Sequence, residues 1–128
     1  MKLDNTLQEI EKSINDIVDI EFDWEGRGFE KPTKLTLTNA IKIVKELLKQ
    51  VDSEDCLWFS PFAYSNEDGY VCIGWQNQNQ ALHFHIKNEN MDYRKIWRSA
   101  NSVKSGSEEG YLNPQNCLLL WKWLINEQ

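Results

Sequence analysis

The sequence lacks the features through which proteins usually bind nucleic acids, membranes or structural metals. Only three Arg accompany eleven Lys, and the formal net charge is −6. Duplex nucleic acid and anionic membrane surfaces are bound through clusters of basic residues, so we expect neither as a partner. The three cysteines, Cys56, Cys72 and Cys117, form no C-x-x-C pair. Their odd number and spacing argue against a disulfide framework and a zinc ribbon.

Long apolar runs and catalytic signatures are also lacking. No stretch approaches the roughly 18–20 apolar residues of a membrane span, and the N-terminal MKLDNTLQEIEK has no apolar run of the kind found in signal peptides. The sequence contains no G-x-S-x-G, no P-loop, no G-x-G-x-x-G and no H-E-x-x-H. We therefore expect a cytoplasmic protein that binds rather than catalyses, and we expect no cofactor.

The length and composition are those of one folded domain. The chain has 128 residues, of which 41% are hydrophobic and 27% charged, and it contains six Trp. This length suffices to bury a single core, and no repeat or linker divides it. We expect one domain spanning residues 1–128.

Three segments have helical periodicity. Apolar residues at positions 3, 7, 10, 14 and 17 step by four and three, which places them on one narrow stripe. This stripe fits either packing against the protein's own sheet or a dimer seam. A second helix is expected after Pro32, with Thr33 as its cap and apolar residues from Leu37 to Val51. Asn113-Pro114 begins a third, largely apolar helix.

The stretch from Leu57 to Arg98 predicts four successive strands joined by turns. They are LWFSPFAYS (57–65), YVCIGWQ (70–76), ALHFHIK (81–87) and YRKIWR (93–98). Pro61 indicates that the first strand is an edge strand or is broken there. Asp68-Gly69 favours a hairpin turn. Residues 99–112 are expected to be a loop, with at most a short strand near Val103.

These elements predict an α+β domain. It comprises two N-terminal helices, a four-stranded antiparallel meander and a C-terminal helix, with the helices packed on one face of the sheet. Alternation assigns the apolar residues of the second and third strands to that face. The opposite face then carries Cys72, Gly74, His83 and His85.

The loop and the sheet together resemble a family of small bacterial proteins. The matching positions are Phe22-Asp23-Trp24-Glu25-Gly26-x-Gly28, a Pro before a helix that contains Ala40, Asp68-Gly69 with Trp75, and a Trp-containing last helix. Members of this family carry a W-D-G-type loop and a D-G…W strand, and no activity is assigned to them. Glu25 stands where Asp is more usual. The resemblance implies a bacterial α+β domain in which Trp24 plugs the core, and it provides no catalytic residue.

His83 and His85 suggest two kinds of chemistry. Residues i and i+2 of a strand share a face, and Cys72 falls on the same side if neighbouring strands pair conventionally. These three side chains could hold Zn²⁺, with a fourth ligand from Asp92 or from residues 107–109. Alternatively, Cys72 is a nucleophile with a His base, as in a hydrolase. Paired His on the polar face of a sheet also occurs without either role.

A third group suggests a ligand platform. Tyr93, Arg94, Trp97 and Arg98 lie close together in the fourth strand. Aromatic faces stack nucleobases and Arg binds phosphates, so a small nucleotide is a candidate ligand. In the other interpretation, Trp97 belongs to the core and the Arg side chains form a charged edge that deters strand addition.

From these features we expect a non-enzymatic interaction domain that acts through self-association as a homodimer or through another protein. A small-ligand binding protein of the nucleotide type is the first alternative, and a metal- or Cys-dependent hydrolase is the second. The contact faces expected for a partner are the narrow seam of the first helix and the apolar last helix.

Overall fold

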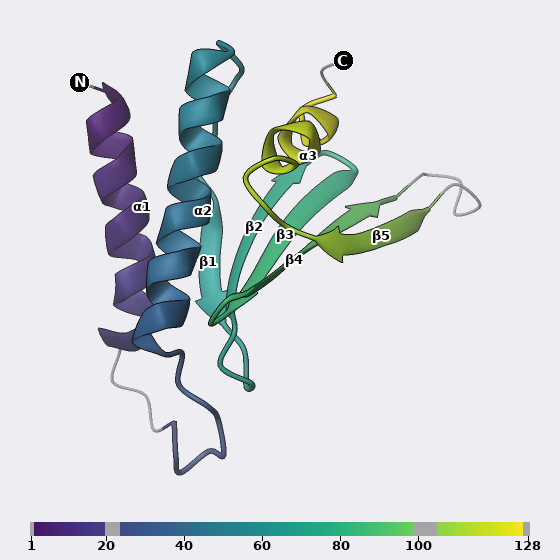
Figure 1. Ribbon diagram of the computed structural model, residues 1–128. Coiled ribbons are helices and arrows are strands. Elements are labelled where there is room, and N and C mark those ends of the chain that lie inside the picture. Colours follow the sequence, from purple (N-terminus) through teal and green to yellow (C-terminus); the bar gives the residue numbers. More distant parts are fainter. Residues whose placement is uncertain (1, 20–23, 99–104, 127–128) are drawn as a thin grey trace.

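The computed structural model describes residues 2–19, 24–98 and 105–126 (Figure 1). The described chain is of the α+β class, as the sequence predicted. Its elements, in order, are α1 (Lys2–Asp19), α2 (Lys34–Ser53), β1 (Phe62–Ser65), β2 (Val71–Asn77), β3 (Gln80–Lys87), β4 (Asn90–Trp97), β5 (Gly106–Tyr111) and α3 (Cys117–Leu124).

The strands form one antiparallel sheet in the order β1-β2-β3-β4-β5, so each strand pairs with the next along the chain. Two-residue turns join β2 to β3 and β3 to β4. In each turn the first residue, Gln78 or Asn88, has a positive φ, of 57° and 54° respectively. Gly69 has a φ of 80° in the turn before β2. The hairpin turn predicted at Asp68-Gly69 is thus present, and glycine allows this conformation without a steric cost.

The sheet has five strands, and the prediction of four was wrong. The additional strand, β5, pairs with β4 from Asp92↔Tyr111 to Trp97↔Gly106. Its sequence, GSEEGY, has no alternating apolar residues, and four of its six residues are exposed. Such a strand is stabilised by the ladder that β4 provides, which local sequence does not reveal. Val103, near which a strand was considered, lies outside the described residues.

The first predicted strand is shorter than expected. Of residues 57–65, only Phe62–Ser65 form a strand, which begins directly after Pro61 and lies at an edge of the sheet. This confirms the prediction from Pro61. The preceding segment is held by tryptophan side chains instead. The indole N–H of Trp75 donates to the Phe59 carbonyl at 3.1 Å, and that of Trp121 donates to the Leu57 carbonyl at 3.0 Å.

The helices begin and end close to where the sequence indicates. Thr33 caps α2, and its side-chain oxygen accepts from the Thr36 backbone N–H at 3.1 Å. The last helix begins later than predicted, because Asn113 and Pro114 lie in a turn that precedes Cys117. There the Asn113 side chain accepts hydrogen bonds from two backbone N–H groups. No helix in residues 2–19, 24–98 and 105–126 is both long and apolar enough to span a membrane.

One hydrophobic core joins residues from the sheet and from all three helices. We call the sheet face that contributes to it the inner face. Its fully buried side chains on β2 and β3 are Val71, Ile73, Trp75, Leu82, Phe84 and Ile86. From the helices, α1 contributes Ile10, Ile14 and Ile17. The stripe of the first helix therefore packs within the protein at Ile10, Ile14 and Ile17, while Leu3 and Leu7 are partly buried.

The family resemblance implied that Trp24 plugs the core, and the structure shows its side chain half-buried. Its backbone carbonyl accepts from the Phe29 N–H at 2.8 Å, which closes a tight turn. Phe22 and Asp23, which belong to the same motif, lie outside the described residues.

Candidate functional site

The opposite face of the sheet, which we call the outer face, carries two cross-strand rows of side chains. In the first, which we call the Tyr64 row, the register aligns Tyr64, Cys72, His85, Asp92 and Tyr111. In the second, the Phe62 row, it aligns Phe62, Gly74, His83, Arg94 and Glu109. Because successive residues of a strand alternate between faces, the two rows lie side by side on the same surface.

Aromatic side chains lie at both edges of the outer face. Phe62 and Tyr64 on β1 are 49% and 44% exposed, and Tyr111 on β5 is 83% exposed. The rings of Phe62 and Tyr64 stack with their centroids 6.1 Å apart. Phe62 also lies over Gly74, where an added Cβ would come within 2.4 Å of its ring. Because glycine has no Cβ, the Phe62 ring can approach the strand this closely.

The centre of the outer face is occupied by the two histidines. Their rings stack with centroids 6.2 Å apart, and Phe62 meets the His83 ring edge-on at 5.9 Å. Burial is the main cause that lowers the pKa of both His83 and His85 below the ordinary value of 6.5. Arg94 lowers both further, while Asp92 acts in the opposite direction on His85. Both imidazoles are therefore mainly neutral at pH 7.

This pKa depression predicts a stability that depends on pH. Because the unfolded chain binds protons at His83 and His85 more readily than the folded chain, these two groups lower the free energy of unfolding once the pH falls below about 6.5, and the loss continues through their lower pKa in the folded state. Well above pH 6.5 both groups are neutral in both states and this loss is absent. We expect the thermal midpoint to drop between about pH 7.5 and about pH 5.5. A His83→Gln/His85→Gln variant should have a flatter profile over the same range, and an unchanged slope would contradict this assignment.

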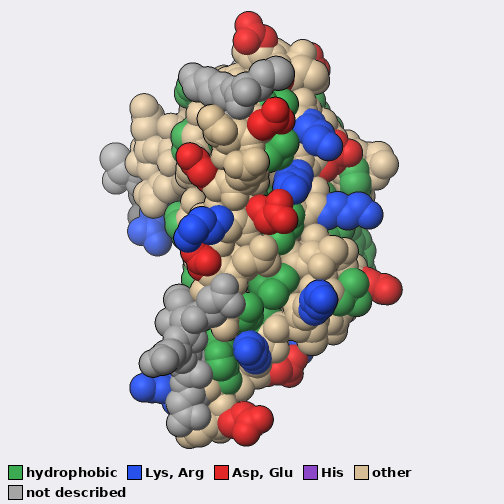
Figure 2. Space-filling model, turned by 90° about the vertical axis from the view of Figure 1, so that its left-hand side faces the viewer, with side chains coloured by type: hydrophobic (Ala, Val, Ile, Leu, Met, Phe, Trp, Pro, Cys, Tyr) green, Lys and Arg blue, Asp and Glu red, His purple; other side chains and the backbone are tan. Residues whose placement is uncertain are grey.

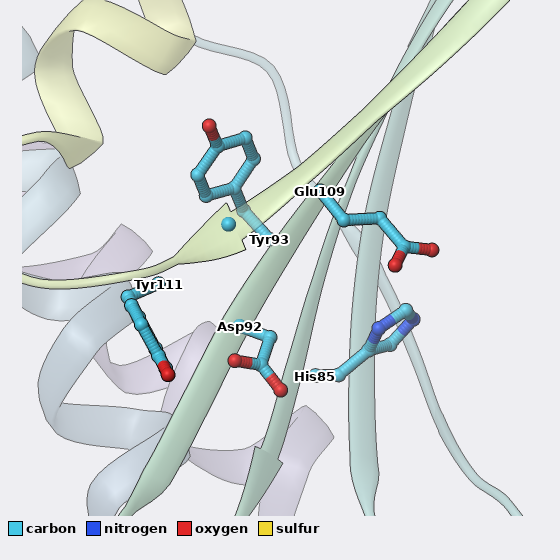
Figure 3. Close-up of a pocket in the computed structure, with 6 residues that line it drawn as sticks. His85, Asp92, Tyr93, Glu109 and Tyr111 are labelled. Carbon is cyan, nitrogen blue, oxygen red and sulfur yellow. The ribbon is translucent and has the colours of Figure 1, made fainter.

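A pocket of about 360 Å³ lies at the β5 side of the outer face. Figure 3 shows the side chains of His85, Asp92, Glu109 and Tyr111 around it, with the Tyr93 ring directed away from them. Glu109 approaches Arg94 with 3.5 Å between Oε1 and Nε. Both of these side chains are largely exposed, so solvent screens their attraction.

A second pocket, of about 410 Å³, lies toward the other end of the outer face. Half of its lining residues carry amide side chains, in or next to the β2–β3 turn, and the others include His83, Ile96 and Arg98. The acidic groups of the face thus lie near one end and Arg98 near the other.

The residues of the predicted nucleotide platform do not converge. Tyr93 and Trp97 lie on the inner side of β4, where Trp97 meets Trp123 of α3 at 6.2 Å between centroids. The Tyr93 hydroxyl donates to Glu108 at 2.8 Å. Arg94 lies on the outer face, opposite His83. Arg98 follows the end of β4 and is exposed.

The residues of the predicted metal or nucleophile site do lie on one face. The register places Cys72 directly opposite His85 and Gly74 opposite His83. Cys72 is only 3% exposed, however, and burial raises the pKa of its thiol. A reactive cysteine needs a lowered pKa and solvent access, so this environment does not activate Cys72. Within residues 2–19, 24–98 and 105–126, no group of three or more His, Cys, Asp or Glu side chains is arranged to hold a metal ion.

Sequence reasoning did not assign Phe62, Tyr64 or Tyr111 to a site. Asp92 and residues 107–109 were considered only as a fourth metal ligand. The alternation of β1 could have placed Phe62 and Tyr64 on one face. No signal in GSEEGY indicates that Glu109 and Tyr111 join them, because that depends on the pairing of β5 with β4.

In comparisons with known proteins, the chain matches no protein-family model, no curated protein and no solved structure. The resemblance to small bacterial proteins with a W-D-G-type loop therefore stays a prediction.

Proposed function

We propose that this protein is a non-enzymatic binding domain whose outer face contacts a protein partner. The observation that carries the proposal is the exposure of three aromatic side chains, Phe62, Tyr64 and Tyr111, at the two edges of one sheet face. Tyr and Arg are enriched where proteins meet, because their side chains combine apolar area with a polar group. Residues of all three helices pack into the core on the inner face of the sheet. This arrangement supports the proposal, because it leaves the outer face open for binding.

The helices offer less for a partner than the outer face does. Figure 2 views the molecule from the side of α1 and shows basic and acidic side chains interspersed over it. Ion pairs such as Lys12–Asp16, at 2.8 Å, and Lys45–Glu11, at 2.9 Å, lie on these helices. On α3, Leu119 is 71% exposed, but the buried side of that helix is occupied by the core. An isolated exposed Leu is common in soluble proteins and needs no partner.

The alternative functions receive less support from the geometry. A nucleotide would bring phosphates toward Asp92 and Glu109, which repel them, and the rings of Tyr93 and Trp97 are turned to the other side of the sheet. A Cys-dependent hydrolase would need the Cys72 thiolate, and the burial of Cys72 favours the protonated thiol. A protein partner requires neither phosphate binding near Asp92 and Glu109 nor a thiolate at Cys72.

Site-specific photocrosslinking tests the proposal. Benzoyl-phenylalanine is introduced in place of Tyr64 or Tyr111, one from each edge of the outer face, in cells that naturally express the protein. We expect both positions to form an adduct of the same mass on irradiation, because one partner covers both edges. Ser13, an exposed position on α1, is the matched control and should form no such adduct.

A second substitution links the adduct to the outer face. Tyr111→Asp should abolish the crosslink formed from position 64, because it places a charge in the contact without touching the core. Equal crosslinking from all three positions, or none from positions 64 and 111, would disprove a partner on this face.

A further inference from the structure

The Tyr64 row and the Phe62 row are chemically complementary to each other. On β4 the first row has the acid Asp92 and the second has the base Arg94. On β1 the rows present two aromatic rings, Tyr64 and Phe62. On β3 each row has an imidazole. On β5 the first row has the Tyr111 hydroxyl and the second has the Glu109 carboxylate. A surface whose halves complement each other is suited to contact with its own copy.

Two-fold symmetry converts this complementarity into contacts. In a symmetric dimer, residue i of one chain meets residue j of the other, and j meets i. Consider a two-fold axis that lies in the interface, runs across the strands and passes between the two rows. It places every residue of the Tyr64 row opposite the Phe62-row residue on the same strand of the second chain.

The resulting pairs are favourable at four of the five strands. Asp92 meets Arg94 as an ion pair, twice by symmetry. Tyr111 meets Glu109 as a hydroxyl and a carboxylate, and Tyr64 meets Phe62 as two rings. At β3 His85 meets His83, and two neutral imidazoles can form a donor–acceptor pair. At β2 Cys72 is buried and Gly74 lies beneath the Phe62 ring, so this strand makes no pair across the axis and adds no bulk between the sheets.

We propose that the outer face packs against the outer face of a second copy of this chain, with Asp92 of each chain paired to Arg94 of the other. This inference rests on the proposed function, because it names the partner of the same surface. The two sheets would form the inner layers of a sandwich, with the helices outside. Sheets that pack in this way keep their strand directions within about 30° of each other.

The size of the face sets the expected strength. Five strands spaced by about 4.8 Å give a width of about 24 Å, and strands of about seven residues have a length of about 23 Å. Each chain thus offers a footprint of about 550 Å², so the dimer buries about 1,100 Å² in total, near the lower limit for specific interfaces. The net charge of −6 per chain opposes association at low salt, but it is screened beyond about 8 Å at physiological ionic strength. We therefore expect a reversible dimer with a dissociation constant in the micromolar range.

Sedimentation velocity across protein concentrations from about 5 μM to about 1 mM tests this inference, in a range that brackets the expected affinity. The expected result is a mass that rises from 15.1 kDa toward twice that value. Asp92→Arg places like charges opposite each other at two symmetric positions, and so does Arg94→Asp. Each should weaken the dimer by at least about tenfold, because close charge pairs across interfaces couple by more than about 1.4 kcal/mol. The Asp92→Arg/Arg94→Asp double variant restores both pairs and should return to within about threefold of the wild type.

The controls separate this inference from the proposed function. Lys12→Asp, a charge reversal on α1, should leave the dimer unchanged, and circular dichroism should show that every variant is folded. Tyr111→Asp places a carboxylate opposite Glu109 of the second chain, and it provides a second disruption at an exposed position if Asp92→Arg unfolds. A chain that stays at 15.1 kDa up to 1 mM overturns the second-copy inference, while crosslinks to a different protein would still support the proposed function. A dimer that is insensitive to the charge reversals uses another surface and also overturns the inference.

Discussion

Trp121→Ala should reduce the free energy of unfolding by about 3–5 kcal/mol, as expected for the truncation of a fully buried tryptophan. The Trp121 ring stacks on Trp58 with centroids 5.0 Å apart and meets Trp75 and Phe59 at 5.5 and 5.1 Å. Its indole N–H also holds the Leu57 carbonyl at 3.0 Å. The substitution therefore removes the contact between α3 and the segment before β1 as well as the ring itself. Small domains have only about 5–15 kcal/mol of stability in total, so much of it depends on this side chain.

Urea unfolding followed by circular dichroism measures this loss. Trp123→Ala is the matched control, because Trp123 lies two residues further on the same helix and is only half-buried. We expect the control to cost less than half as much. Trp121→Phe should have an intermediate cost, since it keeps an aromatic ring and removes the hydrogen bond to Leu57. Equal losses for Trp121→Ala and Trp123→Ala would contradict a core centred on Trp121.

Thr36→Val should cost about 2 kcal/mol, because it removes the acceptor of a part-buried backbone N–H while keeping the shape of the side chain. Thr36 is fully buried near the start of α2, and its hydroxyl accepts from the Asn88 N–H at 2.7 Å. The Thr33 hydroxyl donates to the Asn88 side chain at 2.6 Å, and the Asn39 amide donates to the Asn88 carbonyl at 2.6 Å. These bonds attach the helix to the turn between β3 and β4.

The control for this prediction is Thr38→Val, two residues along the same helix. Thr38 is exposed and its hydroxyl donates to the Lys34 carbonyl within the helix. Its substitution should change stability by no more than about 0.5 kcal/mol. Chemical denaturation of both variants gives the comparison, and a neutral Thr36→Val would show that the helix does not depend on this attachment.

Local sequence was sufficient wherever a segment's own pattern decided its structure. The period of Leu37 to Val51 specified α2, and Thr33 after Pro32 specified its start. Alternation in β2 and β3 separated Ile73 from Cys72, and Phe84 from His83. Each of these predictions depends on neighbouring residues alone, because side-chain direction follows directly from the backbone period.

The candidate site was predictable only in its central part. His83 and His85 share a face through the period of one strand, and the sequence places them together. In β4 the same period separates Tyr93 and Trp97 from Arg94, but it does not say which side faces the core. The structure decides this through α3, whose Trp123 lies against Trp97. Tyr93 and Trp97 therefore lie on the inner face of the sheet, and Arg94 lies on the outer face.

The amino-acid sequence alone specified the helices, the two central strands and the side of the sheet that would carry the histidines. Only the tertiary structure revealed β5 and the alignment of Tyr64 with Tyr111 across five strands. The physical reason is that hydrogen bonds between strands depend on the neighbouring strand as much as on a strand's own residues. A polar segment such as GSEEGY can therefore complete a sheet, and a surface, that its own sequence does not indicate.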